Sequence, residues 1–530
     1  MPTYLTPGVY VQEIPAQSKP IEGVGTSIAA FVGLTPGGPV NTPMRISNWT
    51  EFARAFGDPA NPDNGPFMEG AYLAHAVYGF FQNGGGLCWV IRVGEGDGPG
   101  EAPRPSAARP AATNPEIEAV RAVALPGVDA SVSLEFAQEA APVTEGGDEG
   151  GDDKSGDEGG TYRLVVTAGG QTETHEGLSL KKGRSYIATK VNAASKLIRL
   201  EETGASLPEA QRAPATGSYA LVAASQAPTD LAPKDFEGDV AKRKGMGSLA
   251  AVDEVTMLCM PDIWNLSRNG DDAQVRDLQG KMIAHCENMG DRMAILDPPP
   301  SMAPQDVFEW RMNTAGYDSK FATLYYPWIE VMDPLTSRPM MVPPSGHVAG
   351  VWARTDGSRG VHKAPANEVV LGANGLGMQV THEEQGGLNQ KGINCIRAFP
   401  GRGIRIWGAR TLSSDPEWRY LNVRRLFNFI CESIIEGTQW AVFEPNDQGL
   451  WTRLRISTEN FLTRVWRDGA LFGGTPAEAF YVKCDSETNP PDVIEAGQVV
   501  VEVGIAPVKP AEFVIFKISQ FTAGAAEVSE

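Results

Sequence analysis

Residues 254–262 read EVTMLCMPD and residues 292–299 read RMAILDPP, while the stretch between them, residues 273–290, reads AQVRDLQGKMIAHCENMG. The two outer stretches are short apolar runs, which favour strands, and the middle stretch has the pattern of a helix. A second helix is expected around APQDVFEWRMNTAG (303–316) and a further strand in KFATLYYPWIEV (320–331). Strands and helices that alternate in this way predict a largely parallel sheet covered by helices.

A shorter α/β segment lies near the N-terminus. Residues 26–34 (TSIAAFVGL) and 87–93 (LCWVIRV) favour strands, and helices are expected near 48–57 and within 67–82. The run 70–91 carries no formal charge, but polar residues and three consecutive glycines interrupt it. We therefore interpret this run as a buried helix followed by a strand, and not as a membrane span.

Residues 94–250 differ in character from both α/β regions. They contain linkers rich in proline and alanine, one expected helix within 186–202, and the weakly alternating runs VSLEF (132–136), YRLVVTA (162–168) and YALVAA (219–224). This pattern predicts a small β-rich insertion. Residues 145–160, with seven acidic residues against Lys154, are expected to form a solvated loop. A calcium site is the alternative, although the loop lacks the spacing of an EF-hand.

The C-terminal region begins with two expected helices, roughly 419–437 and 449–472, both rich in apolar residues. Strands are expected in AFYVKCD (479–485), GQVVVEVGIAPV (497–508) and EFVIFKISQF (512–521). The expected fold class is therefore a multidomain α/β (α+β) protein.

Composition excludes several classes of function. The 530-residue chain has a net charge of -20, which disfavours proteins that hold nucleic acid or anionic membranes by bulk attraction. No basic segment precedes an apolar run at the start, so synthesis for the cytoplasm is expected. The six cysteines are widely spaced, never form C-x-x-C, and are expected to be reduced packing residues.

Motifs for catalysis or cofactor binding are scarce. THEEQGG (381–387) begins like a zinc helix but has Gly386 where the second histidine is required, and GANGLG (372–377) does not match the dinucleotide fingerprint. His285 and Cys286 are adjacent on an expected helix, so their side chains point about 100° apart. Asp297, at the end of an expected strand, is the best single candidate for an enzyme site. Capping of a neighbouring loop is the more ordinary role for Asp297.

The segment TPGVYVQEIP (6–15) is an expected strand without a nearby partner. Val9, Tyr10, Val11 and Ile14 favour extended structure, and no hairpin turn follows them. The partner strand must lie far along the chain or in another chain. An extended linker over residues 15–24 would span roughly 30 Å.

The runs 343–367, 388–412 and 415–446, which we interpret as surfaces, carry a resemblance to a known family. Together with TPGVYVQEI, TSIAAFVG, NGGGLCWVIRV (83–93) and PAEFVIFKISQ (510–520), they resemble the contractile tail sheath proteins. That family forms the sheaths of phage tails, R-type bacteriocins and phage-tail-like injection systems. The resemblance extends over residues 1–95 and about 250–521.

The resemblance implies a structural protein with no reaction, cofactor or metal of its own. Such a subunit polymerises helically around an inner tube and contracts to drive the tube through a target envelope. The implied partners are other copies of the chain, the inner tube protein, and baseplate and cap proteins, without nucleic acid or membrane insertion. Assembly in the bacterial cytoplasm is implied, as a component of a phage tail or a phage-tail-like particle. The alternative is a soluble α/β hydrolase-like enzyme with a site near Asp297.

The resemblance also implies a division of the chain. An N-terminal arm (1–22) precedes the first part of the core (23–93), and the inserted outer domain (94–250) precedes a core of subtilisin-like fold (251–412) that carries no recognisable catalytic motif. A C-terminal domain (413–505) and a C-terminal arm (506–530) complete the chain.

Two sets of contact residues follow from the resemblance. The arms would add strands to neighbouring subunits. Their expected residues are Val9, Tyr10, Val11 and Ile14 in the first arm and Phe513, Val514, Ile515, Phe516 and Ile518 in the second. On the helix near 449–472, helical spacing gathers Arg453, Asn460, Arg464 and Arg467 around one face. The resemblance implies that this face contacts the inner tube, and the alternative is a basic face exposed to solvent.

Overall fold

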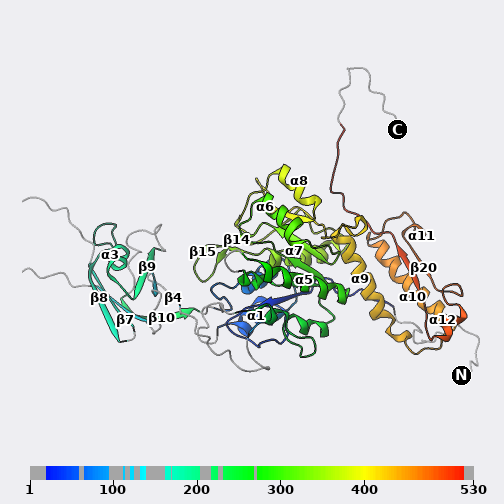
Figure 1. Cartoon of the computed structure of the whole chain (residues 1–530), viewed down its shortest axis with the longest axis horizontal. Coiled ribbons are helices and arrows are strands. Elements are labelled where there is room, and N and C mark those ends of the chain that lie inside the picture. The colour runs from blue at the N-terminus through cyan, green and yellow to red at the C-terminus, as the bar shows by residue number, and fades with distance from the viewer. Residues whose placement is uncertain are drawn as a thin grey trace, which may run out of the picture.

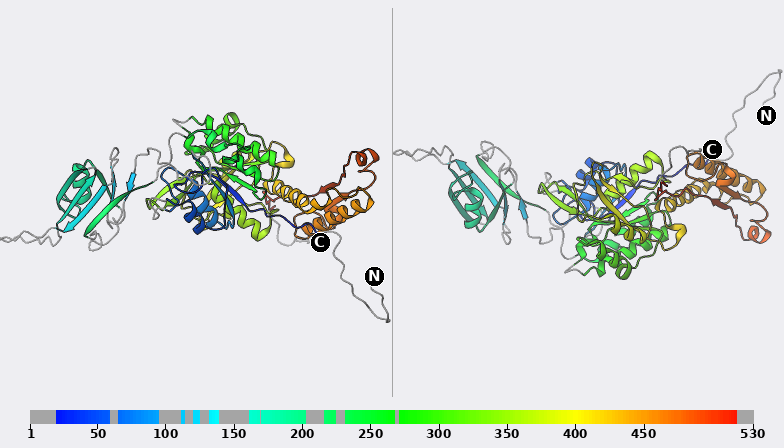
Figure 2. Two further views of the ribbon diagram at one scale, coloured as in Figure 1. Left: turned by 90° about the horizontal axis from the view of Figure 1, so that it is seen from below. Right: turned by 90° about the horizontal axis from the view of Figure 1, so that it is seen from above.

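The computed structural model describes residues 20–58, 65–94, 111–113, 120–124, 132–138, 161–168, 170–202, 216–224, 231–267 and 271–517. Three sheet-containing regions follow one another along the molecule (Figures 1 and 2). A seven-stranded sheet lies at one end, a nine-stranded sheet with its helices lies in the middle, and helices α9 and α10 lie at the other end. The chain is therefore a mixed α/β protein with several structural regions.

The nine-stranded sheet forms the centre of the molecule. Its strand order is β16-β19-β18-β13-β12-β11-β1-β3-β2. These strands are β1 (Ala29–Gly33), β2 (Met44–Ile46), β3 (Cys88–Arg92), β11 (Met257–Cys259), β12 (Met293–Leu296), β13 (Ala322–Tyr326), β16 (Glu368–Val369), β18 (Ile393–Phe399) and β19 (Gly403–Ile406). The six strands from β18 to β3 pair in parallel, so the predicted parallel sheet is confirmed.

Helices cover this sheet on both sides. The helices of the region are α1 (Trp49–Phe56), α2 (Leu73–Gln82), α4 (Pro233–Glu237), α5 (Ala273–Met289), α6 (Pro304–Glu309), α7 (Ser345–Arg359) and α8 (His382–Gln390). A π-helical turn, Trp310–Ala315, extends α6. Helix α5 ends at Gly290, whose φ of 76° is the left-handed conformation that commonly terminates helices. The core is continuous across the sheet and both helical layers.

Helix α7 is part of the core, although residues 343–367 were interpreted as a surface. Ten of its residues are buried, and Trp352 is completely enclosed, with its indole N–H donating to the Tyr325 hydroxyl at 3.1 Å. Glycines allow α7 to approach α2 closely: a Cβ on Gly346 would lie 2.4 Å from the Ala76 Cα, and one on Gly350 would lie 2.5 Å from the Phe80 carbonyl oxygen. The surface interpretation was wrong because these small residues serve close helix packing.

Residues 320–331 form two strands instead of the single predicted one. Strand β13 belongs to the main sheet, whereas β14 (Ile329–Asp333) pairs with β15 (Arg338–Val342) and β17 (Gly375–Leu376) in a three-stranded sheet. Pro327 lies between β13 and β14. Proline has no backbone N–H and so disfavours an uninterrupted ladder.

The region between β3 and α4 contains the seven-stranded sheet, in the order β8-β7-β6-β10-β4-β5-β9. Its elements are β4 (Ala111–Thr113), β5 (Val120–Ala124), β6 (Val132–Gln138), β7 (Tyr162–Ala168), β8 (Gln171–Leu178), α3 (Ile187–Ala194), β9 (Ile198–Glu202) and β10 (Gly217–Ala224). Its described strands pair in antiparallel fashion, and it has its own apolar cluster. The predicted helix over 186–202 is only half correct, since β9 forms its second part. The calcium alternative at 145–160 lies outside the described residues.

The C-terminal region is built on two long helices, α9 (Leu421–Thr438) and α10 (Gln448–Arg467), which lie side by side (Figure 1). Asp447 caps α10 by accepting the Leu450 N–H at 2.8 Å. Two short helices, α11 (Pro476–Ala479) and α12 (Pro491–Glu495), and the antiparallel pair β20 (Phe480–Lys483) and β21 (Glu502–Ile505) follow. Among the described helices, none combines the length and apolar character that crossing a bilayer requires.

Candidate assembly site

The N-terminal segment becomes fixed to the C-terminal region at Ile21. This side chain is fully buried in a cluster that includes Leu426, Phe461 and Leu462. Arg464 donates a hydrogen bond to the Ile21 carbonyl oxygen. The predicted linker over 15–24 is therefore too long at its C-terminal end, because residues from Ile21 onward are anchored. The arm residues Val9, Tyr10, Val11 and Ile14 lie outside the described residues.

A buried ion pair joins this segment to two helices. Arg425 on α9 donates to both carboxylate oxygens of Asp356 on α7, at 2.9 and 2.5 Å, and each side chain is 3% exposed. Arg425 also donates to the Thr26 carbonyl oxygen at 3.0 Å, and the Thr26 hydroxyl donates to Asp356 at 2.7 Å. The three segments therefore meet in one hydrogen-bonded cluster. We call this cluster, formed by Thr26, Asp356 and Arg425, the strut.

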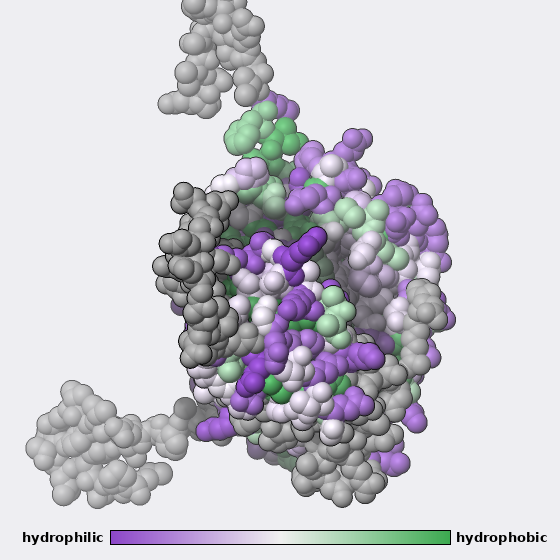
Figure 3. All heavy atoms as spheres, turned by 90° about the vertical axis from the view of Figure 1, so that its left-hand side faces the viewer, coloured by the Kyte–Doolittle hydropathy of each residue, from purple (hydrophilic) through white to green (hydrophobic). Residues whose placement is uncertain are grey.

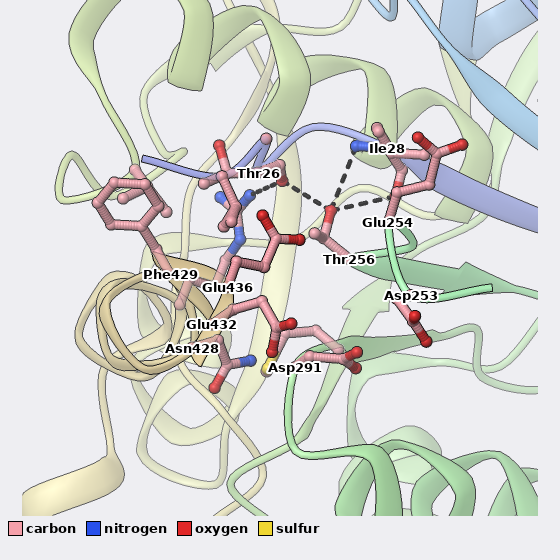
Figure 4. Close-up of a pocket in the computed structure, with 15 residues that line it drawn as sticks. Thr26, Ile28, Asp253, Glu254, Thr256, Asp291, Asn428, Phe429, Glu432 and Glu436 are labelled. Atoms are coloured by element: carbon pink, nitrogen blue, oxygen red, sulfur yellow. Dashed lines mark hydrogen bonds between the residues drawn. The ribbon is translucent and has the colours of Figure 1, made fainter. Parts of the chain in front are cut away.

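Two cavities flank the strut. The first, of about 240 Å³, is shown in Figure 4, where Thr256 bridges the N-terminal segment by donating to the Thr26 carbonyl oxygen at 2.8 Å. Its carboxylates are Asp253, Glu254, Asp291, Glu432 and Glu436. Burial, and to a smaller extent the negative charge of Asp291, raises the pKa of the Glu432 carboxyl. No group of histidine, cysteine or acidic residues within the described ranges is arranged to hold a metal ion.

The second cavity, of about 540 Å³, lies between α7, α9 and α10. Phe429, Phe461, Val465 and Ala470 contribute apolar surface to it. Arg359 and Arg464 contribute positive charge, and both are exposed. Asp356 and Asp468 also line it, so the cavity combines apolar surface with charged side chains of both signs.

The C-terminal segment is anchored near the same junction. Arg410 holds Glu512 with two hydrogen bonds of 2.9 and 2.5 Å, and the side chains are 9% and 16% exposed. Four residues before Glu512, the Val508 carbonyl oxygen accepts a hydrogen bond from the side-chain amide of Asn422 on α9, at 3.1 Å. The segment is thus attached both to the core and to the C-terminal region before it projects into solvent.

Beyond Glu512 the chain presents an apolar stretch to solvent. Phe513, Val514, Ile515 and Phe516 are 75, 70, 80 and 82% exposed, and this stretch projects from the top of the molecule in Figure 3. The predicted strand over 512–521 is not formed here: residues 511–517 are irregular, and Ile518 lies outside the described residues. Strands β20 and β21 pair only with each other among the described strands.

The four residues proposed for α10 do not form a uniform free surface. Arg453 pairs with Glu444 at 3.1 Å and lies over the Trp440 ring, and Arg464 contacts the Ile21 carbonyl oxygen. Asn460 and Arg467 are exposed. Helix α10 therefore uses part of its basic face to hold its own subunit together.

The enzyme candidate Asp297 has a structural role. It is buried and accepts the backbone N–H of Ser345 at 2.9 Å, which caps the start of α7. Burial raises the pKa of Asp297 to about 7. The pKa of the Cys286 thiol is raised by burial and that of His285 is lowered to about 4, so this pair favours the unreactive thiol form.

Two ion pairs hold the terminal segments where they join the fold, and we call these two places the arm roots. The sequence analysis predicted neither ion pair. Asp356 and Arg425 are 69 residues apart, and Arg410 and Glu512 are 102 residues apart. The local signal was a pair of adjacent arginines, Arg424 and Arg425, followed by Leu426 and Phe427 in a helix rich in apolar residues. A charged residue among apolar neighbours indicates a paired charge when the helix is buried.

Comparison with known families gives two consecutive matches. A model described as "Phage tail sheath protein central domain" matches residues 239–412, and one described as "Phage tail sheath C-terminal domain" matches residues 413–521. Together they cover more than half of the 530 residues.

Individual relatives are similar to the chain at low identity. The tail sheath protein of Burkholderia phage BcepMu is 24% identical over 93% of this chain and 92% of its own length. The tail sheath protein of Vibrio phage KVP40 is 26% identical over 41% of this chain, and the match spans about a third (31%) of that relative.

Solved structures show the same fold. The PVC sheath complex of an extracellular contractile injection system, in the contracted state, has a TM-score of 0.57 at 23% identity and covers 98% of this chain and 99% of its own. The helical sheath of the anti-feeding prophage, also contracted, has a TM-score of 0.56 at 24% identity and covers 98% and 100%.

Proposed function

The chain belongs to the phage tail sheath protein family and is a structural subunit of a contractile sheath, and from this premise we propose that it polymerises helically around an inner tube. Contraction of the polymer would drive the tube through a target envelope. Head-to-tail contacts generate an open helical assembly when the rotation between subunits does not close into a ring. The enzyme alternative near Asp297 is not favoured, because that carboxylate caps a helix of the core.

The observation that carries this proposal is the apolar stretch 513–516. In an isolated monomer, a run of large apolar side chains that are 70–82% exposed would promote aggregation. In a polymer, the same run could pair as a strand with a neighbouring subunit and be covered there. Its root is fixed by Arg410 and Glu512, so the stretch leaves the subunit from a defined place. Strand addition to a sheet edge of a neighbour, for which β20 and β21 are the candidates, would satisfy its backbone.

The N-terminal arm would act in the same way. Val9, Tyr10, Val11 and Ile14 are the residues proposed to pair with a neighbouring subunit. Anchoring at Ile21 leaves residues 16–20 as the connection, which reaches roughly 17 Å when extended. The arm must therefore enter a subunit that touches its own.

The finer organisation is also part of the proposal. Residues 251–412 would form a subtilisin-like core, and the inserted sheet within 94–250 would decorate the outer surface. Inner tube, baseplate and cap proteins would be the further partners, with assembly in the bacterial cytoplasm. On α10, the exposed Asn460 and Arg467 are the stronger candidates for tube contact, while Arg453 and Arg464 already have partners within the chain.

The test is removal of residues 1–15, with Val11→Pro as a point variant and Val11→Thr as a matched control. Proline removes a backbone donor from the strand, whereas threonine keeps a β-branched side chain. The truncated and proline variants should unfold at the wild-type temperature but form no tubes under negative stain. Tubes of normal length from the truncated chain would refute strand donation by this arm.

A further inference from the structure

The turn between α9 and α10 presents a bare aromatic side chain. Phe443 is fully exposed and its neighbour Val442 is 60% exposed. Burying a phenylalanine removes apolar surface from water and is favourable, so this exposure forgoes stabilisation of the subunit. Figure 1 shows that the turn lies where α9 ends and α10 begins, at the end of the helix pair away from the nine-stranded sheet.

The backbone at this residue is strained. Phe443 has a φ of 66°, a left-handed conformation that bulky residues rarely adopt. The turn is held on both sides: the Glu444 N–H donates to the Ala441 carbonyl oxygen at 3.2 Å, and Asn446 donates to the Gln498 carbonyl oxygen at 2.8 Å. A strained residue that its surroundings hold in place is characteristic of functional sites.

An aromatic side chain held away from its own subunit is suited to insertion into a pocket of a partner. The cavity between α7, α9 and α10 has a matching apolar character, because Phe429, Phe461 and Val465 line it, while its exposed charged residues are of both signs. Glu444, next to Phe443, already pairs with Arg453 of its own subunit at 3.1 Å, so the match between the turn and the cavity is apolar. At about 540 Å³, the cavity is large enough for an aromatic ring.

The turn and the cavity are at opposite ends of the same helix. The turn precedes Gln448, and the cavity contains Phe461 and Arg464, roughly 20 Å further along α10 at 1.5 Å per residue. Phe443 therefore cannot reach the cavity of its own subunit. Two complementary features at opposite ends of one unit produce a head-to-tail contact that repeats along an assembly.

We propose that Phe443 of one subunit inserts into the cavity between α7, α9 and α10 of a second copy of this chain. The contact rests on the proposed self-assembly and adds to it a contact between side chains, beside the proposed contacts of the arms.

Crosslinking in assembled particles tests the contact directly. In a Cys431→Ser background, which removes the exposed native thiol, Val442→Cys is combined with Asp468→Cys, so that Phe443 itself is retained. A short bismaleimide should give a ladder of linked chains from particles and none from monomers. The control pair, Val442→Cys with Val500→Cys outside the cavity, should give no ladder.

A second variant measures the contribution of the ring. Phe443→Gly relieves the positive φ, so the monomer should unfold at the same temperature or higher. The protein concentration needed for assembly should rise at least about tenfold, as for loss of a central aromatic contact. Phe472→Gly, at a side chain that is 73% exposed, is the matched control and should assemble normally.

The outcomes separate this proposal from the proposed function. If the wild-type chain forms no particles, self-assembly itself fails and this contact fails with it. If particles form but the Val442–Asp468 cysteine pair gives no ladder, or Phe443→Gly assembles at the wild-type concentration, the contact is refuted while the sheath function stands. A ladder between Val9→Cys and Asp468→Cys would assign the cavity to the N-terminal arm and refute the proposal equally.

Discussion

Replacing Arg425 by methionine is expected to lower the free energy of unfolding by about 3–5 kcal/mol. Methionine keeps much of the side-chain volume but leaves Asp356 buried without its cation. Asp356 is 3% exposed and would retain only the hydroxyl of Thr26, at 2.7 Å, as a donor among the contacts of the strut. The change also removes the hydrogen bond to the Thr26 carbonyl oxygen, so the N-terminal segment should loosen at its root.

A double-mutant cycle measures the interaction energy between Arg425 and Asp356. Asp356→Asn alone should also be destabilising, because Arg425 then becomes the unpaired buried charge. The combination of Arg425→Met with Asp356→Asn should cost less than the sum of the single changes, by about 0.5–3 kcal/mol. Denaturant-induced unfolding, followed by fluorescence and by circular dichroism, measures all three variants.

An exposed ion pair provides the control. Arg453 and Glu444 are 34% and 40% exposed, and breaking that pair with Glu444→Gln should cost between about 0 and 1 kcal/mol. If Arg425→Met costs no more than this control, or if the two strut substitutions are simply additive, the strut does not hold the three segments together and the reasoning is wrong.

Three further predictions concern pH, the acidic loop and the tube. Burial raises the pKa of Asp262 from 3.8 to about 7, so the native state binds more protons than the unfolded chain between about pH 4 and 7. The contribution of this group to stability is therefore lost as the pH rises through that window. The denaturant midpoint of the wild type should fall accordingly between these pH values, and that of Asp262→Asn should fall less. Deleting Gly146–Gly160 should leave particles unchanged under negative stain, and their loss would contradict a solvated loop. Arg467→Glu should reduce co-purification with the inner tube at an unchanged melting temperature, whereas Arg464→Glu should lower the melting temperature, because Arg464 contacts the Ile21 carbonyl oxygen.

Much of the core could be predicted because its signals are local. The alternation of apolar runs and helical patterns from 254 to 331 specified the order of β11, α5, β12, α6 and β13, and the structure places them as expected. The errors arose where one local pattern fits two structures. Residues 186–202 continue a helical pattern into β9, and the small residues of α7 were interpreted as a surface when they allow close packing against α2.

The arm roots could not be predicted, because they depend on contacts between distant residues. Nothing near Ile21 indicates that it fills a cluster formed by α9 and α10, since its neighbours are prolines, glycines and polar residues. Likewise, Glu512 looks like the polar start of a strand until Arg410 is placed beside it. The α10 arginines show the converse: their common face was predicted from helical spacing, but spacing does not show that Arg464 is used within the subunit.

The two arm roots lie close to the same helix, and this has a consequence for contraction. The N-terminal root is held to α9 by Arg425 and by the Ser433 hydroxyl, which accepts the Val24 N–H at 3.1 Å, and the C-terminal root is held to α9 by Asn422. Both roots are also bonded to the core, through Thr256 and Arg410, so the core, α9 and the two roots are expected to move as one unit. Under the proposed strand donation, the donated strands would stay paired while subunits rotate, so the change in geometry would have to be absorbed outside these fixed roots. The connections that remain for this are residues 16–20 and the segment after Glu512, so contraction should bend the arms there and leave the strut intact.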